Sequence, residues 1–278
     1  MIGSSLEIMV PLLLAALGGA VSFTGGILVI GLEGLMLMGA FTGYAAAHAT
    51  GSLLLGAAAG SISGVLLAGI FYVFTVPLKA NIYIAGLALN LGIMGLVPVL
   101  SGTLFDTMGV INLPVPAVPT AFDLTVFFYA ALAVLGITSV LLHRTVYGLH
   151  LYAAGENPDT AEVRGIDVKQ TRFLSLLYTG VLCGAGGAVL SLRLGSFVPG
   201  ITAGRGWIAL VAVFLGRKHP LGIAAACFFF ALTESFSVRL QEWMNIQGAA
   251  TLVWATPYAV TLITVVIYRA AVEKRRKL

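Results

Sequence analysis

Long apolar stretches without any Asp, Glu, Lys or Arg dominate the chain. They cover residues 8–32, 34–78, 80–105, 124–142, 173–192 and 248–268. A helix needs roughly 20 apolar residues to cross the hydrocarbon core of a bilayer, so each stretch predicts one crossing and the stretch 34–78 predicts two. A shorter apolar stretch at 221–238 predicts another. The pattern therefore predicts an all-α, polytopic transmembrane helical bundle of about eight spans, with residues 1–278 forming a single domain.

Composition agrees with this pattern. Hydrophobic residues make up 59% of the chain and charged residues only 9%, whereas soluble domains carry about 25% charged residues. The 34 glycines and the absence of strict two-residue alternation favour helices over a β-barrel. Small residues at four-residue spacing, such as Gly60 and Gly64 or Gly180 and Gly184, predict close helix packing. The two cysteines, Cys183 and Cys227, fall in apolar stretches and are expected to be buried, unpaired thiols.

One polar island interrupts the apolar chain at residues 143–172. It holds four acidic and four basic side chains between stretches that have none. Within it, Asn157 and Pro158 are suited to begin a helix, and Arg164 followed by Gly165 is suited to end one. Asp159 and Glu162 then lie near the positive end of the helix dipole. We expect a two-turn helix over 158–164 in a loop outside the membrane; the alternative is an irregular, solvated surface loop.

The distribution of basic residues predicts the topology. Five Lys and Arg side chains follow the last apolar stretch, between residues 269 and 277, so the positive-inside rule places the C-terminus in the cytoplasm. The net charge of +4 is thus a membrane-topology signal, and no nucleic-acid partner is expected. Counting spans backwards places the polar island and Lys79 in the cytoplasm and the 102–123 loop outside. The N-terminus is expected outside.

Two segments that are distant along the chain have similar sequences. Residues 22–27 read SFTGGI and residues 196–201 read SFVPGI, and each is followed by a glycine-rich stretch and an apolar helix. On the predicted topology the two copies start on opposite sides, as in an inverted repeat whose broken helices meet near the membrane centre. Chance similarity in a glycine-rich chain is the alternative.

Four segments resemble the membrane permeases of bacterial ABC importers. They read VIGLEGLMLMGAF from residue 29, KANIYIAGLALNL from 79, GLHLYAAGENPDTAEVRGIDV from 148 and GRGWIALVAVFLGRKHPLG from 204. The resemblance covers nearly the whole chain and is strongest to the branch of basic-membrane-lipoprotein-dependent nucleoside and simple-sugar importers, with ribose-type and branched-chain amino-acid permeases as cousins. Residues 22–29 depart from the family, since relatives carry a charged, polar segment there.

The resemblance implies that helix 158–164 is the coupling helix, which sits in a cleft of the ATPase subunit. The residues expected to contact that subunit or to set the turns around the helix are Gly155, Glu156, Asn157, Pro158, Asp159, Glu162, Arg164 and Gly165. It further implies these partners: a cytoplasmic ABC ATPase, a second permease subunit in a homo- or heterodimer, an extracytoplasmic solute-binding protein or lipoprotein, and membrane lipid. The chain would be a multi-pass protein of the bacterial cytoplasmic (inner) membrane.

Polar groups within apolar stretches are candidates for the solute pathway. Glu33 is isolated from other charges, and a buried charge is costly in a bilayer; it either lines a wet cavity or is paired near an interface. Asn90 either contacts solute or bonds a neighbouring helix. Asn81, near the cytoplasmic edge, is a weaker candidate. Trp207 either anchors an interface or stacks on a nucleobase or sugar, and Glu234 is expected in an interfacial ion pair.

The sequence contains no recognisable catalytic motif. No lysine follows a glycine, so the chain has no G-x-x-x-x-G-K-[ST] phosphate loop. The histidines are not spaced as metal ligands on a helix, and no metal site is expected. We expect a transport subunit, not an enzyme, that binds no cofactor itself while the partner ATPase uses ATP and Mg.

These observations favour a permease for a small polar solute, most simply a nucleoside or related compound. A monosaccharide or a vitamin such as riboflavin is the alternative for the same machinery. An ion-coupled secondary transporter that uses Glu33 or Glu234 as its proton site is the alternative from another class. We expect no paired intramembrane charges suited to ion coupling. An intramembrane enzyme lacks a credible nucleophile and base.

Overall fold

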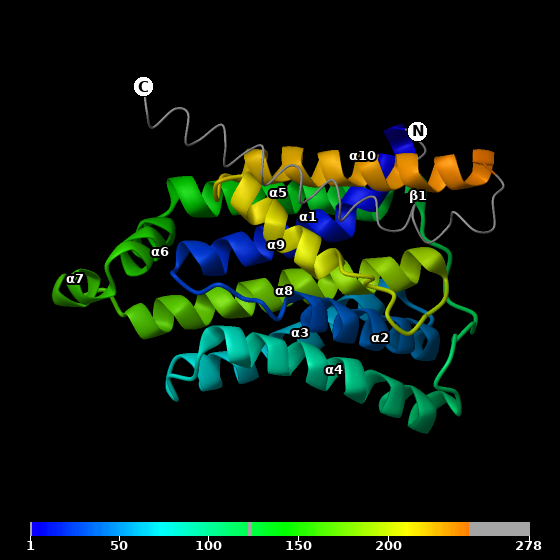
Figure 1. The fold of residues 1–278 in the computed structure, drawn as a ribbon, viewed down its shortest axis with the longest axis horizontal. Coiled ribbons are helices and arrows are strands. Elements are labelled where there is room, and N and C mark those ends of the chain that lie inside the picture. The colour runs from blue at the N-terminus through cyan, green and yellow to red at the C-terminus, as the bar shows by residue number, and fades with distance from the viewer. Residues whose placement is uncertain (1, 122–123, 245–278) are drawn as a thin grey trace.

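A computed structural model describes residues 2–121 and 124–244 as a bundle of helices arranged along one long axis (Figure 1). Its helices are α1 (Ile2–Thr24), α2 (Leu32–Thr50), α3 (Leu53–Thr75), α4 (Ile82–Phe105), α5 (Val126–Arg144), α6 (Val146–Glu156), α7 (Pro158–Val163), α8 (Val168–Leu194), α9 (Arg205–Leu215) and α10 (Pro220–Met244). Two short strands, β1 (Thr120–Ala121) and β2 (Leu124–Thr125), pair in antiparallel fashion.

Six of the described helices, all except α2, α6, α7 and α9, are long and apolar enough to cross a membrane. The prediction of a polytopic helical bundle is therefore confirmed at this level. The small β pair was not predicted. The expected span at 248–268 and the basic tail lie outside the described residues.

The 34–78 stretch forms two helices, as its length predicted. Gly51 ends α2 with a left-handed backbone (φ 64°), and its N–H donates to the Ala47 carbonyl at 2.9 Å. The next residue, Ser52, begins α3 because its hydroxyl accepts from the Leu55 N–H at 3.5 Å. A turn of two residues thus reverses the chain between two apolar helices.

Glycines let α2, α3 and α8 pack with their backbones in contact. A Cβ built on Gly64 would lie 2.1 Å from the Gly180 carbonyl oxygen, and one on Gly184 would lie 2.1 Å from the Gly60 oxygen. Any side chain at these positions would push the helices apart, which confirms the close packing predicted from the spacing. Cys183 and Cys227 are both buried and free, as expected.

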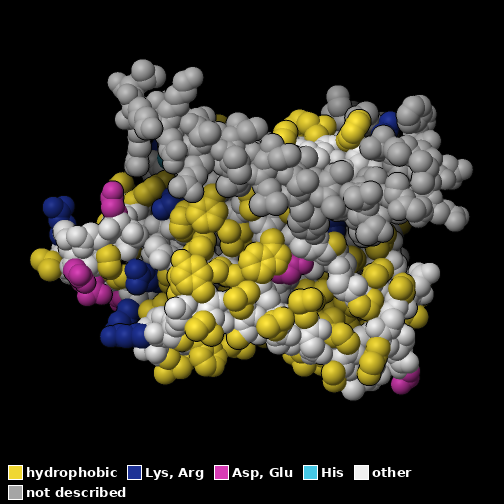
Figure 2. Space-filling view, viewed as in Figure 1, with side chains coloured by type: hydrophobic (Ala, Val, Ile, Leu, Met, Phe, Trp, Pro, Cys, Tyr) yellow, Lys and Arg dark blue, Asp and Glu magenta, His cyan; other side chains and the backbone are white. Residues whose placement is uncertain are grey.

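The two ends of the bundle differ in charge. The α7 end also holds the turns that follow α1, α3, α5 and α9 (Figure 1). Figure 2 shows Lys and Arg side chains gathered there. Seven of the ten basic residues in the described part of the chain lie at or beside these turns, namely Lys79, Arg144, Arg164, Lys169, Arg172, Arg217 and Lys218.

Loops close the opposite end of the bundle. The backbones of Ile111 and Phe197 exchange two hydrogen bonds at 2.8 and 2.9 Å. The Tyr44 hydroxyl accepts from the Leu113 N–H at 2.7 Å and donates to the Leu113 carbonyl at 2.9 Å. The segment 106–121, which includes Ile111 and Leu113, is therefore folded onto this end, away from α7.

Candidate functional site: two broken helices and the α7 end

A break separates α1 from α2. Gly26 adopts φ 86°, and the Ile27 N–H donates to the Ser22 carbonyl at 3.0 Å, so the chain leaves α1 in a tight turn. Residues 25–31, here named the bridge segment, then run back towards the middle of the bundle, where α2 begins (Figure 1). The apolar stretch 8–32 is thus one helix plus a returning segment.

A second break separates α8 from α9 at the other end of the bundle. Gly195, Gly200 and Gly204 have φ values of 69°, 74° and 79°, which favour glycine over other residues. The chain turns back there and α9 begins inside the bundle (Figure 1). The SFTGGI and SFVPGI segments therefore lie at opposite ends and run in opposite directions, as an inverted repeat requires.

Glu33 joins the two broken helices. Its Oε1 accepts from the Gly204 N–H at 2.9 Å, and its Oε2 accepts from the Gly206 N–H at 2.7 Å. These N–H groups belong to the first turn of α9, whose positive dipole end favours a carboxylate. The Glu33 residue is only 8% exposed. Glu33 is thus a buried cap that holds α9 on α2 through two backbone N–H groups.

Asn90 holds the start of α2 by side-chain hydrogen bonds, as Glu33 holds the start of α9. From α4, its Oδ1 accepts from the Gly34 N–H at 2.8 Å, and its Nδ2 donates to the Ile30 carbonyl at 3.1 Å. Both side-chain groups are therefore engaged with the start of α2, and the residue is 4% exposed. The structure favours the bond to a neighbouring helix over solute contact.

Removal of the Asn90 amide tests this assignment. Asn90→Ala leaves the buried Gly34 N–H without its acceptor, which costs about 1–3 kcal/mol. We expect a lower thermal midpoint in detergent, measured by fluorescence-detected size exclusion, and little change in the KM for solute. Leu91→Ala, on the exposed face of the same helix, is the control. A raised KM with unchanged stability would instead assign Asn90 to the solute pathway.

The two remaining pathway candidates lie elsewhere. Asn81 is the N-cap of α4, at the α7 end of the bundle, where its Oδ1 accepts from the Tyr83 and Ile84 N–H groups. Trp207 is on α9, one residue past the Glu33 cap, and is 41% exposed. The structure therefore groups Glu33, Asn90 and Trp207 around the starts of α2 and α9, and separates Asn81 from them.

Two ion pairs join described helices of the bundle. Arg205, the first residue of α9, forms an ion pair with Glu234 near the middle of α10. Arg193 Nε lies 3.3 Å from Glu7 Oε2. The ion pair of Glu234 was predicted, but its position at mid-helix was not. The partner Arg205 is distant in sequence and was missed.

The polar island contains more helix than expected. Residues 146–156 form α6, which runs obliquely to the long helices, and residues 157–167 form α7 and its turns beyond it (Figure 1). Tyr147 ties α6 to α8, since its hydroxyl donates to the Thr171 carbonyl at 3.1 Å. Burial raises the pKa of Tyr147 to about 12, so this donor stays protonated at neutral pH.

Helix α7 begins and ends where the sequence predicted. Asn157 is its N-cap and accepts from the Thr160 N–H at 3.0 Å, and Pro158 is its first residue. Arg164 is the C-cap, and Gly165 turns the chain with φ 84°. Ala161 packs with residues of α6 and α8, while Glu156, Asp159 and Glu162 are exposed.

Apolar side chains are also exposed in the polar island. Val163 is 88% exposed, Leu149 is 69% exposed and Val146 is 67% exposed. Sequence reasoning missed them because it considered only charges in the island. Apolar residues surrounded by polar ones in a segment outside the apolar stretches are the signal that could have identified them.

Gly155 connects the α7 end of the bundle to the bridge segment. It lies in the last turn of α6, not in the turn that was expected of it. A Cβ built on Gly155 would lie 2.0 Å from the Thr24 carbonyl oxygen and 3.0 Å from the Gly26 nitrogen. Arg172 Nε donates to the Gly25 carbonyl at 3.2 Å. The residues that precede α7 therefore press directly on the break between α1 and α2.

Comparison with known proteins identifies the family of this chain. The sequence signature described as "Branched-chain amino acid transport system / permease component" matches residues 1–271. The chain belongs to this permease family. It is a transport component and not an enzyme, and it is a multi-pass membrane protein. No solved structure matches the chain.

Several relatives of this permease have been named. The guanosine ABC transporter permease protein NupQ of Bacillus subtilis is 29% identical over 91% of the chain and 86% of its own length. The nucleoside ABC transporter permease protein NupC of Lactococcus lactis is 29% identical over 93% of the chain and 88% of its own length. TsgC13 of Haloferax volcanii, provisionally named a glucose ABC transporter permease protein, is 32% identical over 87% of the chain and 78% of its own length. As an ABC permease, the chain works with an ATPase and a solute-binding protein.

Proposed function

We propose that the chain forms the membrane path of an ATP-driven nucleoside importer. Its similarity to NupQ and NupC, each over nine-tenths of the chain, supports this solute class. The geometry adds a route by which an external ATPase could move the membrane helices. That route is the backbone contact of Gly155 with Thr24, which is the observation that carries the proposal.

The proposed topology has eight spans. The six long apolar helices, α2 and the 248–268 stretch would cross the membrane, and α9 would cross half of it. The cluster of seven basic residues supports a cytoplasmic position for the α7 end. The N-terminus then lies outside and the C-terminus inside. A second permease subunit, identical or related, would complete the path.

Helix α7 would act as the coupling helix. Two ATPase subunits would close on ATP and Mg and push α7 through contacts with Glu156, Asp159, Glu162 and Arg164. The exposed Val163 would add apolar contact. Through Gly155 the movement would reach the bridge segment, and through Glu33 it would reach α9. The membrane path would thus alternate between outward- and inward-facing states while a lipoprotein or other binding protein delivers solute outside.

Two other functions use the same residues differently. The name of TsgC13 favours a sugar, so a monosaccharide is the second candidate within this machinery; riboflavin has no support among the named relatives. A proton-coupled transporter would need a carboxylate that is free to exchange protons. Both Glu33 oxygens bond the backbone of α9 and Glu234 pairs with Arg205, so neither suits that role.

Uptake in proteoliposomes tests the proposal. The permease, its ATPase and its binding protein should accumulate labelled nucleoside only when ATP is present inside. The permease alone, with a proton gradient, should not. Uptake by the isolated permease would contradict the proposal and favour a secondary transporter. Uptake of glucose but not nucleoside would leave the machinery intact and change the solute.

Variants of α7 test its coupling role. Glu162→Lys reverses an exposed charge on α7, and Gly165→Pro removes a residue with φ 84°. We expect both to reduce ATP-dependent uptake at least about tenfold, because a lost charged contact costs about 1.5–3 kcal/mol. The affinity of the binding protein for solute should not change. Asp106→Lys, at the exposed opposite end, is the control; normal uptake in both α7 variants would refute the role.

A further inference from the structure

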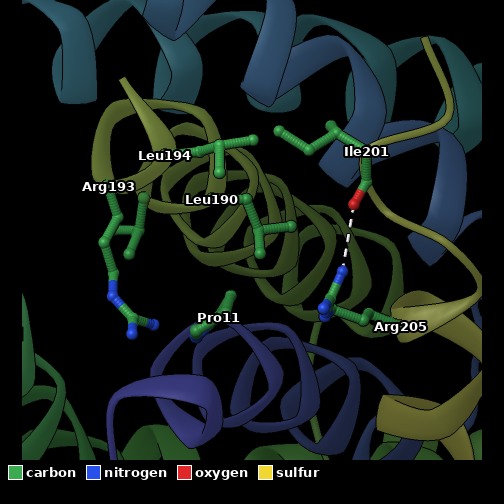
Figure 3. A pocket seen from close by; sticks show the side chains of 7 residues that line it. Pro11, Leu190, Arg193, Leu194, Ile201 and Arg205 are labelled. Carbon is green, nitrogen blue, oxygen red and sulfur yellow. Dashed lines mark hydrogen bonds between the residues drawn. The ribbon is translucent and has the colours of Figure 1, made fainter. Parts of the chain in front are cut away.

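A cavity of about 330 Å³ lies between α1, the last turns of α8 and the segment that leads into α9 (Figure 3). Pro11, Val189, Leu190, Leu194 and Ile201 form its apolar walls. The polar side chains among its described lining residues are Arg193 and Arg205. Its volume is at the lower end of the range of about 300–1,000 Å³ found for small-molecule sites.

The two arginines are only partly used by the protein. Arg193 Nε is 3.3 Å from Glu7 Oε2. Arg205 Nη1 donates to the Ile201 carbonyl at 3.0 Å, drawn as a dashed line in Figure 3, and Nη2 bonds Glu234. Arg205 Nε is buried and has no acceptor within the part of the chain that the structure describes. A buried donor left without an acceptor costs about 1–3 kcal/mol.

The cavity therefore offers hydrogen-bond donors and few acceptors. A guanidinium group has five N–H donors and no acceptor. The nearby carboxylates do not line the cavity, and they are occupied: Glu7 also accepts from the Thr125 hydroxyl at 2.8 Å, and Glu234 binds Arg205. Because each arginine is balanced by a glutamate, an uncharged ligand with acceptor atoms suits the cavity better than a free anion.

We infer that this cavity is a solute site that selects purine nucleosides with a carbonyl, rather than an amino group, at position 6. The inference rests on the proposed nucleoside transport. It specifies which edge of the base the cavity recognises. Arginine donates in bidentate fashion to O6 and N7 of such a base, whereas the N6 amino group of adenine is a donor and opposes it. The apolar walls pack against the flat ring. Arg205 lies between Gly204 and Gly206, the two residues held by Glu33, so a bound base touches the start of α9.

Inosine and adenosine differ at position 6 and provide the test. The permease–ATPase complex in nanodiscs, without the binding protein, is equilibrated by dialysis with each radiolabelled nucleoside. We expect inosine to bind at least ~5-fold more tightly than adenosine. Arg193→Gln should reduce inosine binding to the adenosine level, whereas Arg239→Gln, an exposed arginine on α10, should leave the ratio unchanged.

The ion pair of Arg205 requires its own control. Arg205→Gln should lower both the folded yield and inosine binding. Combining Arg205→Glu with Glu234→Arg restores an ion pair between α9 and α10 and removes the donor from its place in the cavity. The folded yield should recover in this double variant while inosine binding does not. Recovery of both would show that Arg205 acts only through its pair.

Equal affinities for the two nucleosides, or binding of neither, would overturn the inference. The proposed function is judged separately, by ATP-dependent uptake of nucleoside through the complete transporter. If that uptake persists while the nanodisc complex shows no preference, the cavity assignment fails and the importer remains.

Discussion

Replacement of Glu33 by alanine is expected to reduce ATP-dependent uptake by about two orders of magnitude, since it removes two charge-assisted hydrogen bonds worth about 1.5–3 kcal/mol each. Both bonds join α2 to the first turn of α9, at 2.9 and 2.7 Å. Without them the Gly204 and Gly206 N–H groups lose their acceptors, and movement of α2 no longer positions α9. Uptake is measured per folded transporter, quantified by size exclusion.

Two further variants separate a mechanical role from a folding role. Glu33→Gln keeps one carbonyl acceptor for α9 and should retain part of the uptake. Leu35→Ala, a buried apolar truncation two residues away, should lower the folded yield but leave uptake per folded molecule near normal. If Glu33→Ala only fails to insert, or if its folded fraction transports normally, Glu33 is structural and its bonds to α9 do not participate in gating.

Gly155→Ala is expected to uncouple the ATPase from the membrane helices. The new Cβ would lie 2.0 Å from the Thr24 carbonyl oxygen, well inside contact distance, so α6 and the bridge segment must separate. Such overpacking costs about 1–3 kcal/mol. We expect ATP hydrolysis by the assembled complex to continue while solute uptake falls at least about tenfold.

Gly148 provides a matched control on the same helix. A Cβ on Gly148 would lie 2.4 Å from the Leu142 carbonyl oxygen, so Gly148→Ala strains α6 against α5 without touching the bridge segment. It should destabilise the protein to a similar degree but leave hydrolysis and uptake coupled. If both variants lose uptake and hydrolysis together, the Gly155 contact contributes to stability only.

The sequence was sufficient for the features that depend on local chemistry. Runs of apolar residues predicted the long helices, and Asn157, Pro158 and Gly165 defined the limits of α7 because capping requires only neighbouring residues. The two segments in which glycines interrupt the helices were also recognisable, because their sequences are similar. Each of these signals acts within a few residues, so no knowledge of the fold was needed.

The contacts that build the site could not be read in this way. Glu33 meets Gly204 and Gly206 across more than 170 positions, and Arg205 meets Glu234 between two different helices. Nothing local in either segment indicates its partner. Helix α6 was missed because its mixed polar and apolar residues resemble a loop when its packing on Val21 of α1 is unknown.

The distance along the chain between Glu33 and its partners has a consequence for biosynthesis. Residues 204 and 206 leave the ribosome long after α2 has been made, so the nascent chain must first place an unsatisfied carboxylate in the bilayer, at about 2.5–3.5 kcal/mol on translocon scales. The early helices therefore cannot reach their final packing until α9 has been inserted. Maturation of the amino-terminal half waits for the carboxyl-terminal half, and truncated chains that end before residue 204 should be prime substrates for membrane proteases.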